Sequence, residues 1–230
     1  KLDKKNIQVA AAGGVFLNVK MNSLLLQKKI IHGLFIYPSP ADGGVAVGAS
    51  IAAYKKFGGM MKVFSMQAVD LGCGFSKKEI KKALAAFSQK ILINDLKDTI
   101  CKKTAEYLSQ GEVIGWFQGR GEWGPRALGY RSVLSDPRNI EAKERINSKL
   151  KERDWFMPFA PVILEEQSGE FLQHGFGNAF MTLLDDIKKD KIKKIPAAIH
   201  VNNTARAQII KKETNPKYWQ LISEFYKLTG

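Results

Sequence analysis

Strand-like and helix-like segments alternate through the first 58 residues, and this alternation restricts the fold more than any other feature. The expected elements are, in order, a strand at 7–12, a turn at Gly13-Gly14, a helix at 19–29, a strand at 33–37, a Pro/Asp/Gly loop at 38–44 and an alanine-rich helix at 45–56. Such alternation is typical of a layered α/β unit. About fifty residues do not complete a sheet alone, so we expect residues 1–58 to need neighbouring strands.

Residues 59–230 continue the mixture after a turn-rich boundary. Helices are expected after Ser76, where Glu79 completes a capping box, at 96–109, at 136–150 with Asp136-Pro137 as its start, and from Asn215-Pro216 onward. A buried strand is expected at 113–117, and further strands at 132–134, 159–164, 179–183 and 197–201. The whole pattern predicts a mixed α/β fold.

Length and composition place the chain among soluble globular proteins. Its 230 residues are 45% hydrophobic and 25% charged, enough for a core without disulfides or metals. Cys73 and Cys101 lack metal-ligand spacing and are interpreted as reduced thiols of a cytoplasmic protein. No apolar run reaches the roughly 18 residues of a membrane span, so we expect no membrane partner. Because the sequence begins with Lys1, we expect that an N-terminal portion has been removed.

The net charge of +14 raises the question of nucleic-acid binding. Several lysine pairs have acidic residues nearby, which is typical of solvated faces: Lys77-Lys78, Lys81-Lys82, Lys188-Lys189 and Lys193-Lys194. This distribution argues against a continuous nucleic-acid surface. A basic nucleic-acid-binding module stays the alternative from a different functional class.

Arginine, unlike lysine, is concentrated in one part of the chain. Six of the seven arginines lie between residues 120 and 153, whereas the 29 lysines are spread throughout. A guanidinium is a planar fork of donors that binds phosphate or carboxylate in bidentate fashion. The cluster therefore predicts an anion site, with phosphate as the leading ligand.

The first of these arginines lie in a glycine-rich loop after the strand at 113–117. The loop carries, in order, Gly119, Arg120, Gly121, Glu122, Gly124, Pro125, Arg126 and Arg131. Glycines let the backbone approach a ligand closely, and the three arginines would converge on one anion. Glu122 would pair with an arginine or help to hold Mg²⁺. The structural alternative is a loop held by ion pairs and backbone carbonyls; the Gly-Lys-Ser/Thr ending of a Walker A loop is absent.

Polar residues at 146–161 form a second candidate segment. Asn147 lies seven residues after Ile140, on the same face of the expected helix. Lys151 and Arg153 follow near the helix end. The segment either contacts a ligand or only ends a helix, and the arginine loop favours the ligand.

The third and fourth segments lie outside the arginine cluster. Thr204, Arg206 and Gln208 alternate, so on one strand they would face the same way, while nearby His200 is interpreted as structural. Gly13-Gly14 leaves backbone amides free for a phosphate or ribose. Asp42 is either a helix cap or a metal or hydroxyl ligand.

Together these segments resemble the O-carbamoyltransferase family that includes nodulation protein U and the cephem and tobramycin carbamoyltransferases. The resemblance covers nearly the whole chain. Its most specific part is Gly124-Pro125-Arg126-Ala127-Leu128-Gly129 followed by Arg131-Ser132, supported by Gly13-Gly14-Val15 with Asn18, by Lys151, Arg153 and Pro158-Phe159-Ala160-Pro161, and by Thr204-Ala205-Arg206 with Gln208.

The resemblance implies two domains. Residues 1–58 would be the end of an actin-like carbamoyl-transfer domain. Residues 59–230 would be most of a YrdC-like domain, an open twisted sheet with flanking helices, truncated at its C-terminus. With ATP and Mg²⁺, the YrdC-like domain would convert carbamoyl phosphate to carbamoyl-adenylate. The other domain would pass the carbamoyl group to a hydroxyl of a small-molecule acceptor, such as a sugar or a natural product.

The resemblance also implies residue roles. Arg126, Arg131 and Lys151 would be catalytic, stabilising charge on the phosphoryl oxygens. The substrate- and nucleotide-binding residues would be Arg120, Glu122, Gly124, Ser132, Asn147, Arg153, Thr204, Arg206, Gly14 and Asn18. Asp42 would bind a divalent metal, with Fe²⁺ as one candidate and the other ligands outside this chain.

The sequence departs from the family at several positions. Asn202 and Asn203 stand where members often have aspartate and glycine, and Met157 where they often have arginine. The family's histidine metal ligands lie upstream, and its segment after the last helix is missing beyond Gly230, so we expect the piece to bind nucleotide without completing the reaction. An enzyme of tRNA threonylcarbamoyl-adenosine synthesis, which shares the adenylate chemistry, remains the alternative among enzymes.

Overall fold

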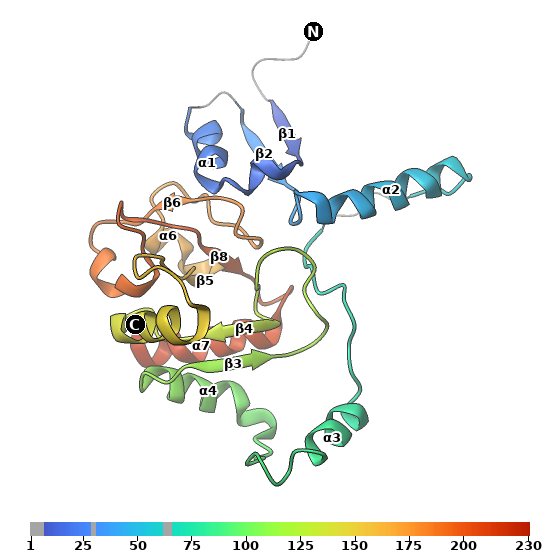
Figure 1. The fold of residues 1–230 in the computed structure, drawn as a ribbon. Coiled ribbons are helices and arrows are strands. Elements are labelled where there is room, and N and C mark those ends of the chain that lie inside the picture. The colour runs from blue at the N-terminus through green and yellow to red at the C-terminus, as the bar shows by residue number, and fades with distance from the viewer. Residues whose placement is uncertain (1–6, 29–30, 62–65) are drawn as a thin grey trace.

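The computed structural model describes residues 7–28, 31–61 and 66–230. Within them, seven α-helices and eight short strands form a mixed α/β fold, which confirms the predicted class (Figure 1). The described strands pair as four two-stranded sheets. No helix in these three ranges is long and apolar enough to cross a membrane.

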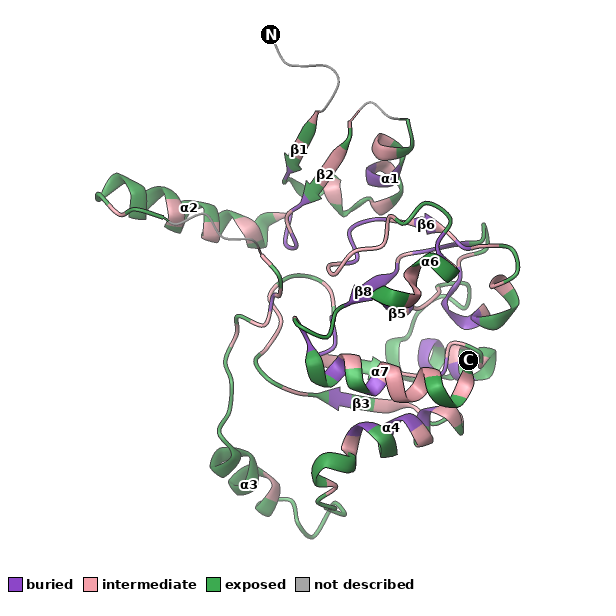
Figure 2. Ribbon diagram, turned by 180° about the vertical axis from the view of Figure 1, so that it is seen from behind, coloured by how far each residue is buried: buried purple, intermediate pink, exposed green. Residues whose placement is uncertain are grey.

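The N-terminal unit follows the expected order of elements. Strand β1 (Gln8–Ala11) pairs in parallel with β2 (Gly33–Ile36), and α1 (Val19–Gln27) lies beside them. Residue 29, the expected end of this helix, lies outside the described residues. Helix α2 (Asp42–Lys56) buries none of its residues and projects away from the rest of the molecule (Figures 1 and 2).

The remaining elements form the larger part of the molecule. Antiparallel pairs join β3 (Ile114–Phe117) to β4 (Arg131–Leu134) and β6 (Asp185–Asp186) to β7 (Thr204–Ala205), while β5 (Val162–Leu164) runs parallel to β8 (Gln208–Ile210). The helices are α3 (Lys77–Ala85), α4 (Ile100–Ser109), α5 (Ile140–Arg145), α6 (Ser168–Phe171) and α7 (Pro216–Thr229), with a π-helix at Ile146–Lys151 directly after α5.

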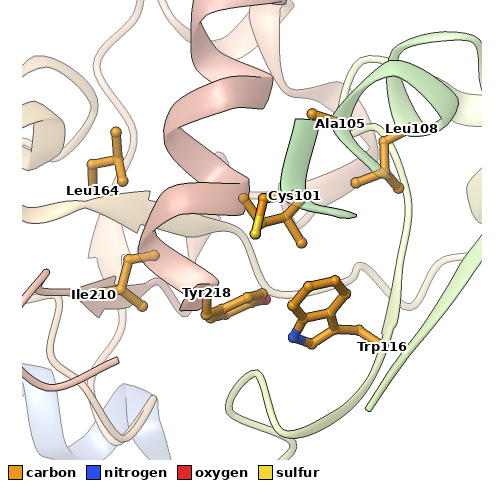
Figure 3. Close-up of a cluster of buried hydrophobic side chains, with 8 residues drawn as sticks. Cys101, Ala105, Leu108, Trp116, Leu164, Ile210 and Tyr218 are labelled. Atoms are coloured by element: carbon orange, nitrogen blue, oxygen red, sulfur yellow. The ribbon is translucent and has the colours of Figure 1, made fainter. Parts of the chain in front are cut away.

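The main core lies where α4 packs on α7 and both contact the strands (Figure 3). Its buried side chains are Cys101, Ala105, Leu108, Trp116, Leu164, Ile210, Tyr218 and Leu221. Burying an aliphatic or aromatic side chain of this size contributes about 1.5–3 kcal/mol. This core fixes β3 and β4, and with them the two ends of the arginine loop.

The N-terminal unit docks on a loop more than 150 residues later in the chain. The buried Asn22 donates from Nδ2 to the carbonyl oxygen of Thr182 at 2.9 Å. Ser23 Oγ donates to the carbonyl oxygen of Leu184 and accepts from its amide. Ala11, Ile36 and Leu183 close a small apolar cluster beside these bonds.

Helix starts with complete capping signals were predicted correctly. Ser76 and Glu79 form the expected capping box of α3. Asn215 is the N-cap of α7, with Pro216 in its first turn. The Oδ1 atom of Asn215 accepts from the amide of Tyr218 and also from Nε2 of Gln118, just after β3.

The start of the third helix was predicted wrongly. Asn139, not Asp136, is the N-cap of α5 and accepts from the amide of Ala142. Both carboxylate oxygens of Asp136 instead bind the guanidinium of Arg138. This charged pair takes the carboxylate out of the capping position.

Two expected strands are absent from the described residues, and one has a different burial. Residues 179 and 180 form a turn and 181–183 have no regular secondary structure, because Asn178 Oδ1 accepts from the amides of Phe180 and Thr182. Pro196 begins a 3-10 helix in place of the strand at 197–201. In β3, Trp116 is buried but Phe117 is 58% exposed, so this strand is buried on one side only.

Candidate anion-binding site

The arginine loop is built around the carboxylate of Glu122. Its Oε1 atom accepts from the amides of Leu128 and Tyr130 at 2.6 and 2.9 Å. Burial, followed by the charges of Asp70 and Glu122, raises the pKa of Tyr130 to about 12. From the sequence, Glu122 was expected to pair with an arginine or to help hold Mg²⁺. In the structure its Oε1 atom instead accepts hydrogen bonds from the loop backbone.

Arg120 and Arg131 donate to backbone carbonyls. Arg120 donates from Nε to Gly72 and from Nη2 to Leu71, at 2.6 and 3.0 Å. Arg131 donates to the carbonyl oxygens of Gln118, Gly119 and Tyr130, and its guanidinium carbon lies 3.5 Å from the centroid of the Phe117 ring. These two arginines take the structural role that had been left open as the alternative.

Arg126, Arg153 and Arg206 behave differently. None of the three makes a side-chain hydrogen bond or an ion pair with another described residue, and the buried Nε of Arg206 has no partner there. Burial, followed by the positive charges of Arg126 and Arg153, lowers the pKa of Arg206 to about 10. Burial also lowers the pKa of Arg126. We call these three residues the unpaired arginines.

Three separate elements bring the unpaired arginines together. Arg126 lies in the loop between β3 and β4, and Arg206 lies between β7 and β8. Arg153 follows the π-helix and a left-handed Glu152 with φ of 48°. A short π-helical stretch is often found at functional sites.

Asn147 holds the segment that carries Arg153. It is 1% exposed, its Nδ2 donates to the carbonyl oxygen of Met157, and its own carbonyl accepts from the amide of Arg153 at 2.9 Å. Asn147 therefore supports the segment of Arg153, and its Oδ1 is buried without a partner among the described residues. Its contact with a ligand stays a prediction.

Gly129 shows why the loop needs glycine at its end. Its φ is +96°, and a Cβ there would collide with the Tyr218 ring of α7. Ser132 accepts from the amide of Gly129 through Oγ. The predicted site residue Ser132 therefore supports the loop backbone.

Two other predicted residues, Thr204 and Lys151, differ in burial and in bonding. Thr204 is buried and donates to Asn202 Oδ1, whereas Lys151 is exposed without a hydrogen bond to a described residue. Thr204, Arg206 and Gln208 do not share one strand, because β7 and β8 are separate.

In the N-terminal unit, Asn18 caps α1 by accepting from the amide of Met21. Gly14 begins a 3-10 helix and has open space around it. Asp42 is the first residue of α2, so it lies in the first turn and is not the cap. In the part of the chain that the structure describes, no three His, Cys, Asp or Glu side chains gather as a metal site.

Some contacts of the site had no signal in the sequence. The Tyr37 ring packs on that of Trp123, and Gln208 donates from Nε2 to the carbonyl oxygen of Leu128. A pocket of about 340 Å³ lies elsewhere, beside β5 and α7, and none of the unpaired arginines lines it. Its lining is mostly apolar and includes the basic residues Arg138, Lys193 and Lys194.

Comparison with known proteins gives two family matches. The model described as carbamoyltransferase C-terminus matches residues 105–230, and the one described as carbamoyltransferase N-terminus matches residues 1–51. The unpaired arginines all lie within the first of these ranges.

Curated relatives align with nearly the whole chain. Nodulation protein NolNO of Sinorhizobium fredii is 36% identical over 97% of this chain and 33% of its own length. Nodulation protein NolO of Bradyrhizobium diazoefficiens is 36% identical over 97% of this chain and 41% of its own length. Nodulation protein U of Azorhizobium caulinodans is 29% identical over 95% of this chain and 37% of its own length. The chain thus spans 33–41% of the length of these relatives.

Proposed function

Because this chain belongs to the carbamoyltransferase family, we propose that it serves the transfer of a carbamoyl group to a hydroxyl of a small-molecule acceptor. Water would first cleave carbamoyl phosphate to carbamate and inorganic phosphate. An oxygen of the carbamate would then attack the α-phosphorus of ATP, which forms carbamoyl-adenylate and releases pyrophosphate. The acceptor hydroxyl would then attack the carbamoyl carbon, and AMP would leave. Because the chain spans only 33% and 41% of the length of NolNO and NolO, the complete reaction is proposed for a protein of the length of these relatives.

The unpaired arginines carry the proposal. Arg126 and Arg206 are partly buried and lose hydration, and the charges of Arg126 and Arg153 both repel that of Arg206, with no acidic partner among the described residues. Such an arrangement destabilises the empty site. A phosphate group that enters it supplies the missing negative charge and acceptor oxygens. The geometry therefore supports a phosphorylated ligand at this site.

These arginines would bind and orient the phosphates of ATP and carbamoyl phosphate. With its pKa at about 10, Arg206 keeps its proton at neutral pH and acts as a fixed positive charge. Charges held in place before the reaction stabilise the negative charge that grows on transferring phosphoryl oxygens. Arg131 and Glu122 would contribute indirectly, by keeping the loop of Arg126 in shape.

The proposed metal ions need ligands in addition to those of this chain. Mg²⁺ would accompany ATP, and Asp42 would offer one carboxylate to a divalent ion such as Fe²⁺. One carboxylate does not hold such an ion, and the described residues offer no group of three ligands. The other ligands would come from outside the chain.

Calorimetric titration with ATP and with carbamoyl phosphate tests the proposal. Arg126→Ala and Arg206→Ala should each weaken binding about 10- to 150-fold, the equivalent of about 1.5–3 kcal/mol for one charged hydrogen bond. Arg145→Ala is the matched control, because it removes the same charge from an exposed arginine whose single hydrogen bond, to the carbonyl oxygen of Gly111, is long at 3.4 Å. Equal binding by all four proteins would refute the site.

Isotope exchange separates the two adenylate chemistries. Exchange between ATP and pyrophosphate that depends on carbamoyl phosphate supports carbamoyl transfer. Exchange that requires threonine and bicarbonate would instead support threonylcarbamoyl-adenosine synthesis. Both measurements use the same protein, so the outcome assigns the substrate directly.

A further inference from the structure

We propose that Tyr37, Trp123 and Gly124 form a joint that positions Arg126, so that the N-terminal unit helps to shape the anion site. The three residues contact no ligand in this proposal; they act through the backbone that carries Arg126. The inference rests on the proposed function, because it assigns a role in binding the same phosphorylated ligand.

The first half of the joint is a contact between two aromatic rings. Tyr37 directly follows β2, and Trp123 lies in the arginine loop, three residues before Arg126. Their ring centroids are 5.0 Å apart and their planes meet at 66°, an edge-to-face pair. The amide of Trp123 also donates to the carbonyl oxygen of Val69 at 2.7 Å, which fixes the backbone below the ring.

The second half is a close approach of two backbones at the next residue. Gly124 has φ of +112°, and a Cβ there would lie only 3.1 Å from the carbonyl oxygen of Pro38. Glycine is therefore favoured for two reasons: its backbone conformation, and a Cβ that would crowd the carbonyl oxygen of Pro38. Pro125 and then Arg126 directly follow Gly124 in the sequence.

Rigid chain links the joint to the guanidinium. Only Pro125 separates Gly124 from Arg126, and proline fixes its own φ. A displacement at Gly124 is therefore passed to Arg126 without a flexible residue to absorb it. Because Arg126 makes no side-chain hydrogen bond with a described residue, its position depends on this backbone.

The loop on the other side of the joint is equally restrained. Residues 37–41 connect β2 to α2, and the carbonyl oxygen of Pro40 accepts from the amide of Gly13 at 2.6 Å. Ser39 is buried within the loop. Both sides are thus fixed, so the joint transmits position between the N-terminal unit and the anion site.

Two substitutions at Tyr37 test the joint with ATP as the probe. Tyr37→Ala removes the ring and should weaken ATP binding about 5- to 10-fold, because Arg126 loses its fixed position. Tyr37→Phe keeps the ring and should bind ATP as the unsubstituted chain does. Rescue by phenylalanine separates positioning by the ring from a general loss of stability.

A glycine pair supplies the second test. Gly124→Ala should weaken ATP binding about tenfold or more, since alanine would strain the backbone at this φ and crowd the carbonyl oxygen of Pro38. Gly58→Ala is the matched control: Gly58 has φ of +85° but nothing within 4 Å of a Cβ. It should lose stability through the same backbone strain while keeping its affinity for ATP.

The outcomes are distinguishable. Normal ATP affinity in folded Tyr37→Ala would overturn the joint even if Gly124→Ala failed to fold, and so would equal losses in Gly124→Ala and Gly58→Ala. In either case Arg206→Ala would still weaken binding, and the proposed function would stand. If the unsubstituted chain bound neither ATP nor carbamoyl phosphate, the proposed function and this inference would both fall.

Discussion

Two sets of arginines lie close together in this molecule and differ in their partners. Arg120 and Arg131 donate to backbone carbonyls of the loops they connect. The charges of Arg126 and Arg153 both act on Arg206, and none of the three side chains binds a described acceptor. The same side chain thus serves structure in one set and offers free donors in the other. Partners, more than residue type, separate the two roles.

The difference has an energetic side. Donating to several carbonyls satisfies the guanidinium of Arg131 and ties β3 to β4, so the first set stabilises the fold. In the second set, the partial burial of Arg126 and Arg206 and the like charges around Arg206 destabilise the empty fold and favour an anion. Substitutions in the first set should therefore lower stability with little change in affinity for the anion. Substitutions in the second set should lower affinity without lowering stability.

The largest effect is expected from the double substitution Arg126→Ala with Arg206→Ala. It removes two of the three unpaired charges, so affinity for ATP should fall by at least about 100-fold, or roughly 3 kcal/mol. The unfolding temperature in phosphate-free buffer should stay the same or rise. Calorimetry and thermal unfolding measure the two quantities. A loss of affinity no greater than that of Arg145→Ala would break the comparison.

Arg131→Ala should show the reverse profile. The loss of its hydrogen bonds to carbonyls and of its stacking on Phe117 should lower the free energy of unfolding by about 2 kcal/mol. ATP affinity, measured well below the unfolding temperature, should change far less than in the double variant. Urea titration gives the stability. A large loss of affinity with unchanged stability would assign Arg131 to the ligand instead.

Arg206→Met sharpens the contrast with a smaller effect. Methionine has a similar length without the charge, so the free energy of unfolding should increase by about 1 kcal/mol in phosphate-free buffer. Added phosphate should stabilise the unsubstituted chain more than this variant. Urea titrations with and without phosphate compare the two proteins. Destabilisation of the variant without phosphate would show that Arg206 has a structural partner.

The smallest effect concerns pH. The folded-state pKa of Arg206, about 10, lies below its ordinary value of 12.5, so the side chain is protonated in both folded and unfolded chains up to about pH 9. Its contribution to ATP affinity should change less than about twofold between pH 7.5 and 9, and should decline as the pH passes 10. Its unfavourable contribution to stability is complete below pH 10 and diminishes between pH 10 and 12.5. Comparing the chain with Arg206→Met across this range isolates the effect.

Local signals in the sequence predicted elements well where one short motif determines the structure. The capping box at Ser76 and the Asn215-Pro216 start of α7 need only neighbouring residues. The start of α5 failed because Asp136 had a stronger partner in Arg138. The expected strand at 179–183 failed because Asn178 bonds the backbone itself.

The residues of the candidate site could be recognised from the sequence only in part. Arg126, Arg153 and Arg206 were all recognised as candidates from their residue type and surroundings. Their separation from Arg120 and Arg131 depends on which carbonyls come near in the fold, such as that of Gly72, 48 positions from Arg120. The contact between Tyr37 and Trp123 also joins distant segments. No local pattern specifies either of them.

The side-chain oxygen of Asn215 links the opening of the first turn of α7 to the release of Gln118, which follows β3. Because it accepts from both Tyr218 and Gln118, the last helix cannot fray at its first turn without freeing the residue that leads into the arginine loop. Amide hydrogen exchange at Tyr218 and along β3 should therefore proceed through one shared opening. The C-terminal helix and this loop would then belong to a single cooperative unit of folding.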